Sequence, residues 1–162
     1  MKTKIGLLIG TLCLSNFSMA NGDPDFISFA LKQAHDRSFY GCDAGIKNTF
    51  RLASGSDIRV FSDTFKETQN DSLKLTGIYG SKGDTVFLEA EYRVKNKKCY
   101  VTESSIITSS KSCTAYASEM KAFNFLAETG DYIVMKNQGG IPMFLKPLDN
   151  SCIAIFQTNS VF

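Results

Sequence analysis

Three glutamates are the residues best spaced for acid–base chemistry. Glu89 and Glu91 are two positions apart in an alternating segment, so in a strand their side chains would share one face, about 7 Å apart. Glu103 is expected across from them on the returning segment. Carboxylate pairs at such distances hydrolyse glycosides, but glutamates followed in the row by Arg93 are also typical of a solvated strand face. We expect these glutamates to be surface residues and not a catalytic pair.

His35 is the only histidine of the chain. A nucleophile–base–acid triad would need a serine such as Ser38 beside it, yet the Gly-X-Ser-X-Gly pattern of a nucleophile elbow is absent. A histidine near the C-terminal end of a helix is also favoured by the helix dipole alone. We therefore expect a structural histidine and predict no catalytic residues, no metal site and no cofactor.

The N-terminal segment predicts export from the cytoplasm. Lys2 and Lys4 precede a short apolar stretch, 5–14, and Ser18-Met19-Ala20 provides the small residues that a signal peptidase requires. We interpret residues 1–20 as a signal peptide, cleaved after Ala20, and residues 21–162 as a single globular domain. So short a signal is typical of bacteria, which predicts the periplasm, with secretion as the alternative.

Four cysteines remain after the predicted cleavage, and an exported chain with an even number predicts two disulfides. A regular strand from Cys99 to Ser109 would hold Cys99 too far from Cys113 for a bond. Two pairings remain open: Cys42–Cys99 with Cys113–Cys152, or Cys42–Cys113 with Cys99–Cys152. The first is favoured, because Cys42 and Cys113 both begin a Cys-X-Ala sequence near a helix start, and the other two both begin a strand.

The charge balance argues against a nucleic-acid ligand. Two of the 18 basic residues, Lys2 and Lys4, lie in the predicted signal, so the remaining 16 balance the 16 acidic ones. A neutral domain has no global attraction for a polyanion. After Ala20 no apolar run approaches the length of a membrane-spanning helix, so we expect no integral membrane protein.

Apolar residues at helical spacing predict three helices. Asp23-Pro24 is a typical helix start, and a second run is expected from a Ser38 cap to Ser54-Gly55. A short helix is expected over 112–120, with Ser112 as its cap.

Alternating segments separated by short turns predict two groups of four antiparallel strands. They cover 58–65, 73–80, 86–94, 99–108, 123–128, 131–137, 141–148 and 152–158. Pro142 and Pro147 predict that the seventh strand is short, bulged or at an edge, because proline donates no hydrogen bond. The expected fold is α+β: N-terminal helices packed on a curved, mostly antiparallel sheet of seven or eight strands, with two disulfides.

The last three strands are apolar at both alternating positions, so both of their faces need cover. The cover could come from the chain itself, from a partner protein or from self-association. A basic hairpin tip is a second candidate contact, suited to an acidic partner surface, a lipid A phosphate or a polyanion. The candidate partner-binding residues are Arg93, Lys95, Lys97, Lys98, Met143 and Phe144, with Phe162 expected in the same patch as the last two.

Together these patterns favour an exported, non-catalytic protein that binds another protein of the cell envelope. The sharpest form is an inhibitor or immunity protein against an envelope-acting hydrolase, inserting the turn at Lys95–Lys98 or Gln138–Gly140 into a cleft. A binding module for an apolar small molecule or lipid is the first alternative. A small secreted hydrolase that uses Glu89, Glu91 or His35 is the second.

Overall fold

A computed structural model describes residues 24–54 and 58–162 of the chain. The predicted signal peptide, the Asp23 cap and Gly55 lie outside these residues. The described helices are α1 (Pro24–Asp36), α2 (Asp43–Thr49) and α3 (Cys113–Glu119), with a short 3-10 helix, η1 (Lys66–Thr68). The described strands are β1 (Arg59–Asp63), β2 (Ser72–Ser81), β3 (Asp84–Lys95), β4 (Lys98–Ser109), β5 (Phe123–Thr129), β6 (Tyr132–Asn137), β7 (Pro142–Leu148) and β8 (Ser151–Val161).

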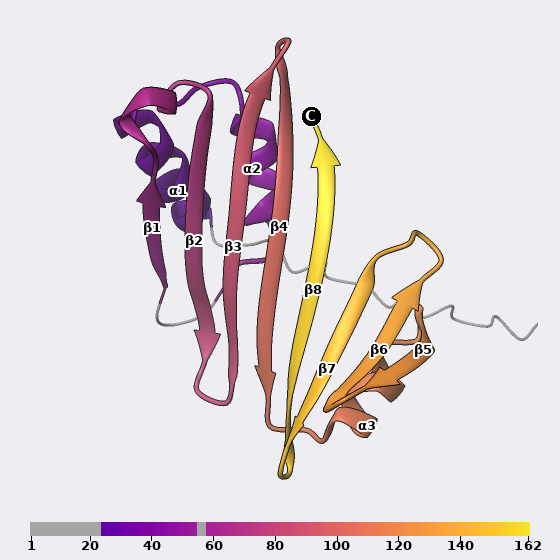
Figure 1. Ribbon diagram of the computed structural model, residues 1–162. Helices are drawn as coiled ribbons and strands as arrows, with labels where there is room; N and C mark the ends of the chain where they lie inside the picture. The colour runs from indigo at the N-terminus through magenta and orange to yellow at the C-terminus, as the bar shows by residue number, and fades with distance from the viewer. Residues whose placement is uncertain (1–23, 55–57) are drawn as a thin grey trace, which may run out of the picture.

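The eight strands form one antiparallel sheet in the order β1-β2-β3-β4-β8-β7-β6-β5. Each half is a meander of four strands, and the halves join where β4 pairs with β8 (Figure 1). The sheet does not close, so β1 and β5 are its two edges. The predicted α+β fold with a mostly antiparallel sheet is confirmed.

All three helices lie on one face of the sheet, behind it in the view of Figure 1. Helix α1 begins at Pro24, as expected, and buries Phe26, Ala30 and Ala34. Helix α3 begins with the predicted cap, since the Ser112 hydroxyl accepts a hydrogen bond from the Ala115 amide. This cap satisfies an amide group that the first turn of α3 leaves free.

Helix α2 is shorter than predicted. Ser38 adopts a positive φ of 60° and Gly41 one of 93°, so the chain turns sharply before the helix begins at Asp43. The helix ends at Thr49, before Ser54. The spacing nevertheless identified the buried residues correctly. Phe39 and Phe50 lie in the turns on either side of the helix, and neither has any exposed surface.

The helices and the sheet enclose two separate apolar clusters. The first lies between α1, α2 and strands β1–β4, and includes Phe26, Phe50 and Leu75. Gly77 of β2 lets the Phe50 ring approach the strand, because a Cβ there would lie 2.7 Å from its Cε1 atom. The second cluster lies between α3 and strands β6–β8, and includes Met143 and Leu145.

One disulfide belongs to each cluster. Cys42, just before α2, bonds to Cys99 at the start of β4, and Cys113 of α3 bonds to Cys152 at the start of β8. These are the pairs that the matching positions in the sequence favoured. Each bond therefore fastens the helix layer of one half to that half's last strand.

Strand β7 is not an edge strand, because it pairs with β6 on one side and β8 on the other. Its prolines lie near its two ends, at Pro142 and Pro147, where the loss of one donor disturbs the ladder least. The irregularity lies instead in the edge strand β5, where the register shifts between Phe125 and Ala127.

Candidate protein-binding face

The strand residues that point away from the helices form what we call the open face. Residues directly opposite each other in neighbouring strands point to the same side of a sheet, so the register assigns each one. Buried residues such as Leu75, Ala90 and Ala154 belong to the helix side, and their chain neighbours belong to the open face. Among the described residues, no helix covers this second face (Figure 1).

One line of residues crosses the open face from β2 to β5 without a polar side chain. Each member is directly opposite the next in the register. We call it the apolar row: Ile78, Phe87, Ile106, Ile155, Phe144, Val134 and Ala127. Phe87 is 39% exposed, and the other members are half-buried by their neighbours. An apolar line that runs across seven strands is more than the scattered exposed side chains of an ordinary surface.

Glu89 and Glu91 both lie on the open face, as predicted. Lys74 places its Nζ 3.4 Å from a carboxylate oxygen of Glu89, and Arg93 donates to Oε1 of Glu91 at 2.7 Å. All four side chains are at least two-fifths exposed to solvent. The two glutamates are thus occupied by ion pairs on an open surface.

The prediction that Glu103 lies with them is wrong. Glu103 is directly opposite Ala90 and therefore points to the helix side, while Glu91 is opposite Thr102. A shift of one position in the register moves a side chain to the other face of a sheet. The three carboxylates therefore do not form a single cluster.

The predicted basic tip is formed where β3 turns into β4. Arg93, Lys95 and Lys98 are on the open face, and Lys97 lies in the two-residue turn, where it and Asn96 have positive φ angles of 61° and 53°. Such angles are typical of the tight turns that join twisted strands. A shallow depression of about 590 Å³ lies beside the tip. It is lined by Glu91, Arg93, Lys95, Asn96, Tyr100 and Thr102.

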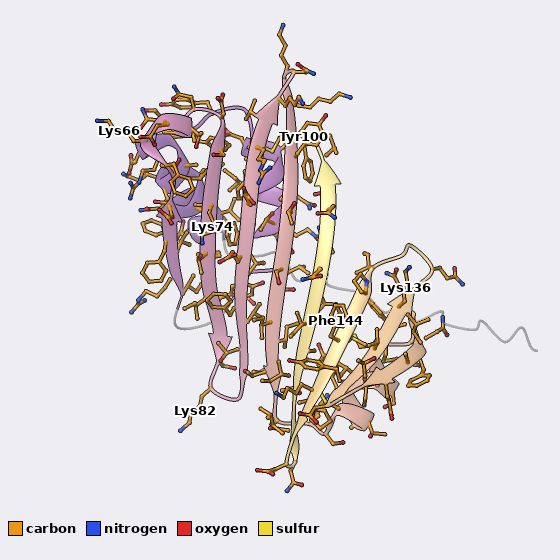
Figure 2. All side chains as sticks on the ribbon, viewed as in Figure 1. Lys66, Lys74, Lys82, Tyr100, Lys136 and Phe144 are labelled. Atoms are coloured by element: carbon orange, nitrogen blue, oxygen red, sulfur yellow. A yellow bond between two sulfur atoms is a disulfide. The ribbon has the colours of Figure 1, made fainter. Side chains whose placement is uncertain are left out.

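The structure separates Met143 from Phe144. Phe144 is in the apolar row, and Figure 2 shows it on the same face as Lys74 and Tyr100. Met143 is fully buried in the second cluster, so its prediction as a contact residue is wrong. Phe162 is partly exposed, but its backbone pairs with Cys99 in both directions. The sequence showed apolar residues at both positions without showing which position faced the helices.

His35 lies away from the open face. Its Nε2 atom is 3.0 Å from Oδ1 of Asp43, and its ring packs against Tyr40 with the ring centres 5.0 Å apart. The contact connects the end of α1 to the start of α2. Within the described chain no serine hydroxyl is hydrogen-bonded to this ring. The arrangement is that of a histidine that holds two helices together.

A cleft of about 500 Å³ lies on the helix side, between the two clusters. Its polar lining includes Glu103, Thr49 and Arg51, and its apolar lining includes Leu88 and Ile107. Burial raises the pKa of the Glu103 carboxyl, while the neighbouring Thr49 hydroxyl and Arg51 guanidinium favour the charged form and oppose the shift. The same environment raises the pKa of Tyr79 to about 12, chiefly by burial.

The sequence contained a signal for this cleft that our prediction missed. Glu103 alternates in step with Cys99, Val101 and Ile107, which are the apolar positions of its strand. A charged residue at an apolar position indicates a site where the core is interrupted.

The described residues contain no group of three or more histidine, cysteine, aspartate or glutamate side chains that could hold a metal ion. None of the helices seen here has both the length and the apolar character needed to cross a membrane.

No protein-family model matches the chain, and neither the curated proteins nor the solved structures contain a match to it.

Proposed function

We propose that this chain is an exported, non-catalytic protein that binds another protein through its open face. In its sharpest form it is an inhibitor or immunity protein against an envelope-acting hydrolase. The observation that carries the proposal is the apolar row, which runs across seven strands with no described element over it. Covering such a line removes apolar surface from water and favours association.

The open face is large enough for a stable complex. The seven spacings of an eight-stranded sheet, at about 4.8 Å each, give a width of about 34 Å. The eight strands average about nine residues, which gives a mean length of about 26 Å at about 3.3 Å per residue. The resulting area of about 900 Å² is comparable to the roughly 800 Å² that each partner contributes to a standard interface.

Rigidity supports inhibition as the form of binding. The face consists of strands, and each half is fastened by its own disulfide. A pre-organised surface loses little conformational entropy on binding. The turns at Lys95–Lys98 and Gln138–Gly140 lie at the rim, where they extend the contact.

Two observations support an extracytoplasmic location. Disulfides are typical of oxidising compartments, and both pairs are formed here. The N-terminal sequence predicts a signal peptide. We place the protein in the periplasm, with secretion as the alternative.

The test compares two phenylalanines on opposite faces. Phe87 of the apolar row is 39% exposed, and Phe29 of α1 is 45% exposed. Each is replaced in turn by the photo-crosslinker p-benzoylphenylalanine, and the native host is irradiated. We expect the Phe87 position, and not Phe29, to give one adduct, identified by mass spectrometry as an envelope hydrolase.

The purified chain should then inhibit that hydrolase, and Phe87→Ala should weaken the inhibition by about tenfold, while Phe29→Ala leaves it unchanged. Equal adducts from both positions, or a captured hydrolase that the purified chain does not inhibit, would refute the proposal.

The helix-side cleft supports a second candidate, the binding of an apolar small molecule or lipid. Its volume of about 500 Å³ is within the range of ligand sites, and Val86, Leu88 and Ile107 provide apolar walls. We expect a lipid to remain with natively purified protein, seen by native mass spectrometry, and to be lost on Leu88→Glu but not on Phe87→Glu. Ligand-free native protein would exclude this candidate.

A further inference from the structure

We infer that the partner presents an acidic surface beside an apolar one, which the open face recognises by charge as well as by apolar contact. This inference rests on the proposed function and specifies the chemistry of the partner. It comes from how the sheet distributes its charged residues between its two faces.

All the basic residues of the strands lie on the open face. The register places seven there, against three acidic residues. The basic residues are Arg59, Lys74, Arg93, Lys95, Lys98, Lys136 and Lys146; the acidic ones are Asp63, Glu89 and Glu91. The helix side of the same strands has no basic residue and three acidic ones, Asp84, Glu103 and Glu128.

This separation is a local property that the neutral net charge conceals. The predicted mature chain has equal numbers of basic and acidic residues. A positive open face therefore requires a compensating acidic excess on the rest of the molecule. Such a division of charge attracts an acidic partner to the open face and not to the rest of the surface.

Several of these cations are available to a partner. Glu89 and Glu91 already hold Lys74 and Arg93. Among the described residues, Lys95, Lys98 and Lys136 have no acidic side chain within ion-pair distance, and all three are exposed. Lys95 and Lys98 close the β3–β4 hairpin, and Lys136 lies on β6 in the other half (Figure 2). The free cations therefore lie on one side of the apolar row, in both halves of the sheet.

The pattern fits a protein better than a membrane or a second copy. An anionic bilayer presents uniform charge and would also press against Asp63, Glu89 and Glu91, whereas a folded partner can place its carboxylates at the free lysines alone. Two copies that met through their open faces would bring two positive surfaces together, which costs free energy. A partner whose carboxylates meet the free lysines avoids both costs.

The test uses the yield of the Phe87 photo-adduct, so it measures contact at the face itself. We expect Lys95→Glu/Lys98→Glu to lower the yield by about tenfold, and Lys136→Glu to lower it by less, because reversing a charge removes attraction and adds repulsion. Raising the salt concentration should lower the adduct yield of the protein without charge reversals and leave the yield of the double variant little changed. Lys82→Glu is the matched control, since Lys82 is exposed in the β2–β3 turn, outside the strands.

Each outcome has a distinct meaning. If the chain with the photo-crosslinker at position 87 and no charge reversal gives no adduct, the proposed function itself fails. If the adduct forms but neither charge reversal nor salt changes its yield relative to Lys82→Glu, only the acidic-partner inference fails. Two further results would also overturn the inference. They are an adduct with a second copy of the chain, and charge-dependent binding of the purified protein to phosphatidylglycerol vesicles.

Discussion

At the scale of single residues, one position in the register decides the environment of a charged side chain. Glu89 and Glu91 face solvent and hold basic partners, whereas Glu103, on the neighbouring strand, points into the helix-side cleft. Burial penalises the charged form of a carboxyl. It raises the pKa of Glu103 above its usual value of 4.5. The folded protein therefore keeps this proton to a higher pH than the unfolded chain does.

This difference predicts how stability depends on pH. The contribution of Glu103 is fully present below its unfolded pKa and is lost as the pH rises through the raised folded value. We therefore expect Glu103→Gln to melt at a higher temperature than wild type at pH 7, with the difference shrinking toward pH 4. Thermal unfolding followed by circular dichroism measures this, with exposed Glu67→Gln as the control. The same difference at both pH values would rule out a buried charge as its cause.

At the scale of elements, each half of the sheet has its own helix layer, apolar cluster and disulfide. The Cys113–Cys152 bond closes a segment of 39 residues, and Cys42–Cys99 closes one of 57. In the chain-entropy model, bonds of these spans each contribute about 4 kcal/mol. Since the clusters are separate, losing one bond should loosen mainly its own half.

Hydrogen exchange tests this division. In Cys113→Ala/Cys152→Ala we expect amide protection to fall in α3 and β5–β7, while β2 and β3 keep theirs. Cys42→Ala/Cys99→Ala should show the reverse pattern. An equal loss of protection in both halves would mean that the two clusters unfold as one unit.

At the scale of the whole molecule, the pairing of β4 with β8 is the one place where the described strands of the two halves meet. The chain end completes it: Val161 is opposite Tyr100, and Phe162 exchanges two backbone hydrogen bonds with Cys99, at 2.9 and 3.0 Å. The C-terminus therefore belongs to the seam of the sheet. Its backbone hydrogen bonds therefore stabilise the sheet, whether or not its side chain also contacts a partner.

Deleting residues 160–162 removes the two backbone hydrogen bonds between Phe162 and Cys99 and, by the alternation of an antiparallel pair, the two between Ser160 and Val101. At about 1 kcal/mol for each lost bond, the free energy of unfolding should fall by about 4 kcal/mol. Urea unfolding measures this. Phe162→Ala keeps the backbone bonds and should cost less than the deletion. If the single substitution costs as much as the deletion, the side chain and not the seam explains the effect.

The sequence predicted local structure well where the signal was local. The Ser112 cap, the alternation along β3 and the turn at Lys95–Lys98 depend on neighbours in the chain, and each appears in the structure. Helix α2 was overestimated because apolar spacing continues through Phe39 and Phe50, which pack from turns. The same burial is reached there without a helix.

The sequence by itself determined the classes of element, the residues that must be buried in most of them and, through matching cysteine positions, the favoured disulfides. Only the tertiary structure decided which side of each strand the helices cover. Alternation separates a strand's residues into two sets without assigning either set to the core, so the prediction put Met143 on the same face as Phe144, and Glu103 on the same face as Glu91. The apolar row and the division of charge arise between strands distant in the chain, and exist only once their register is set.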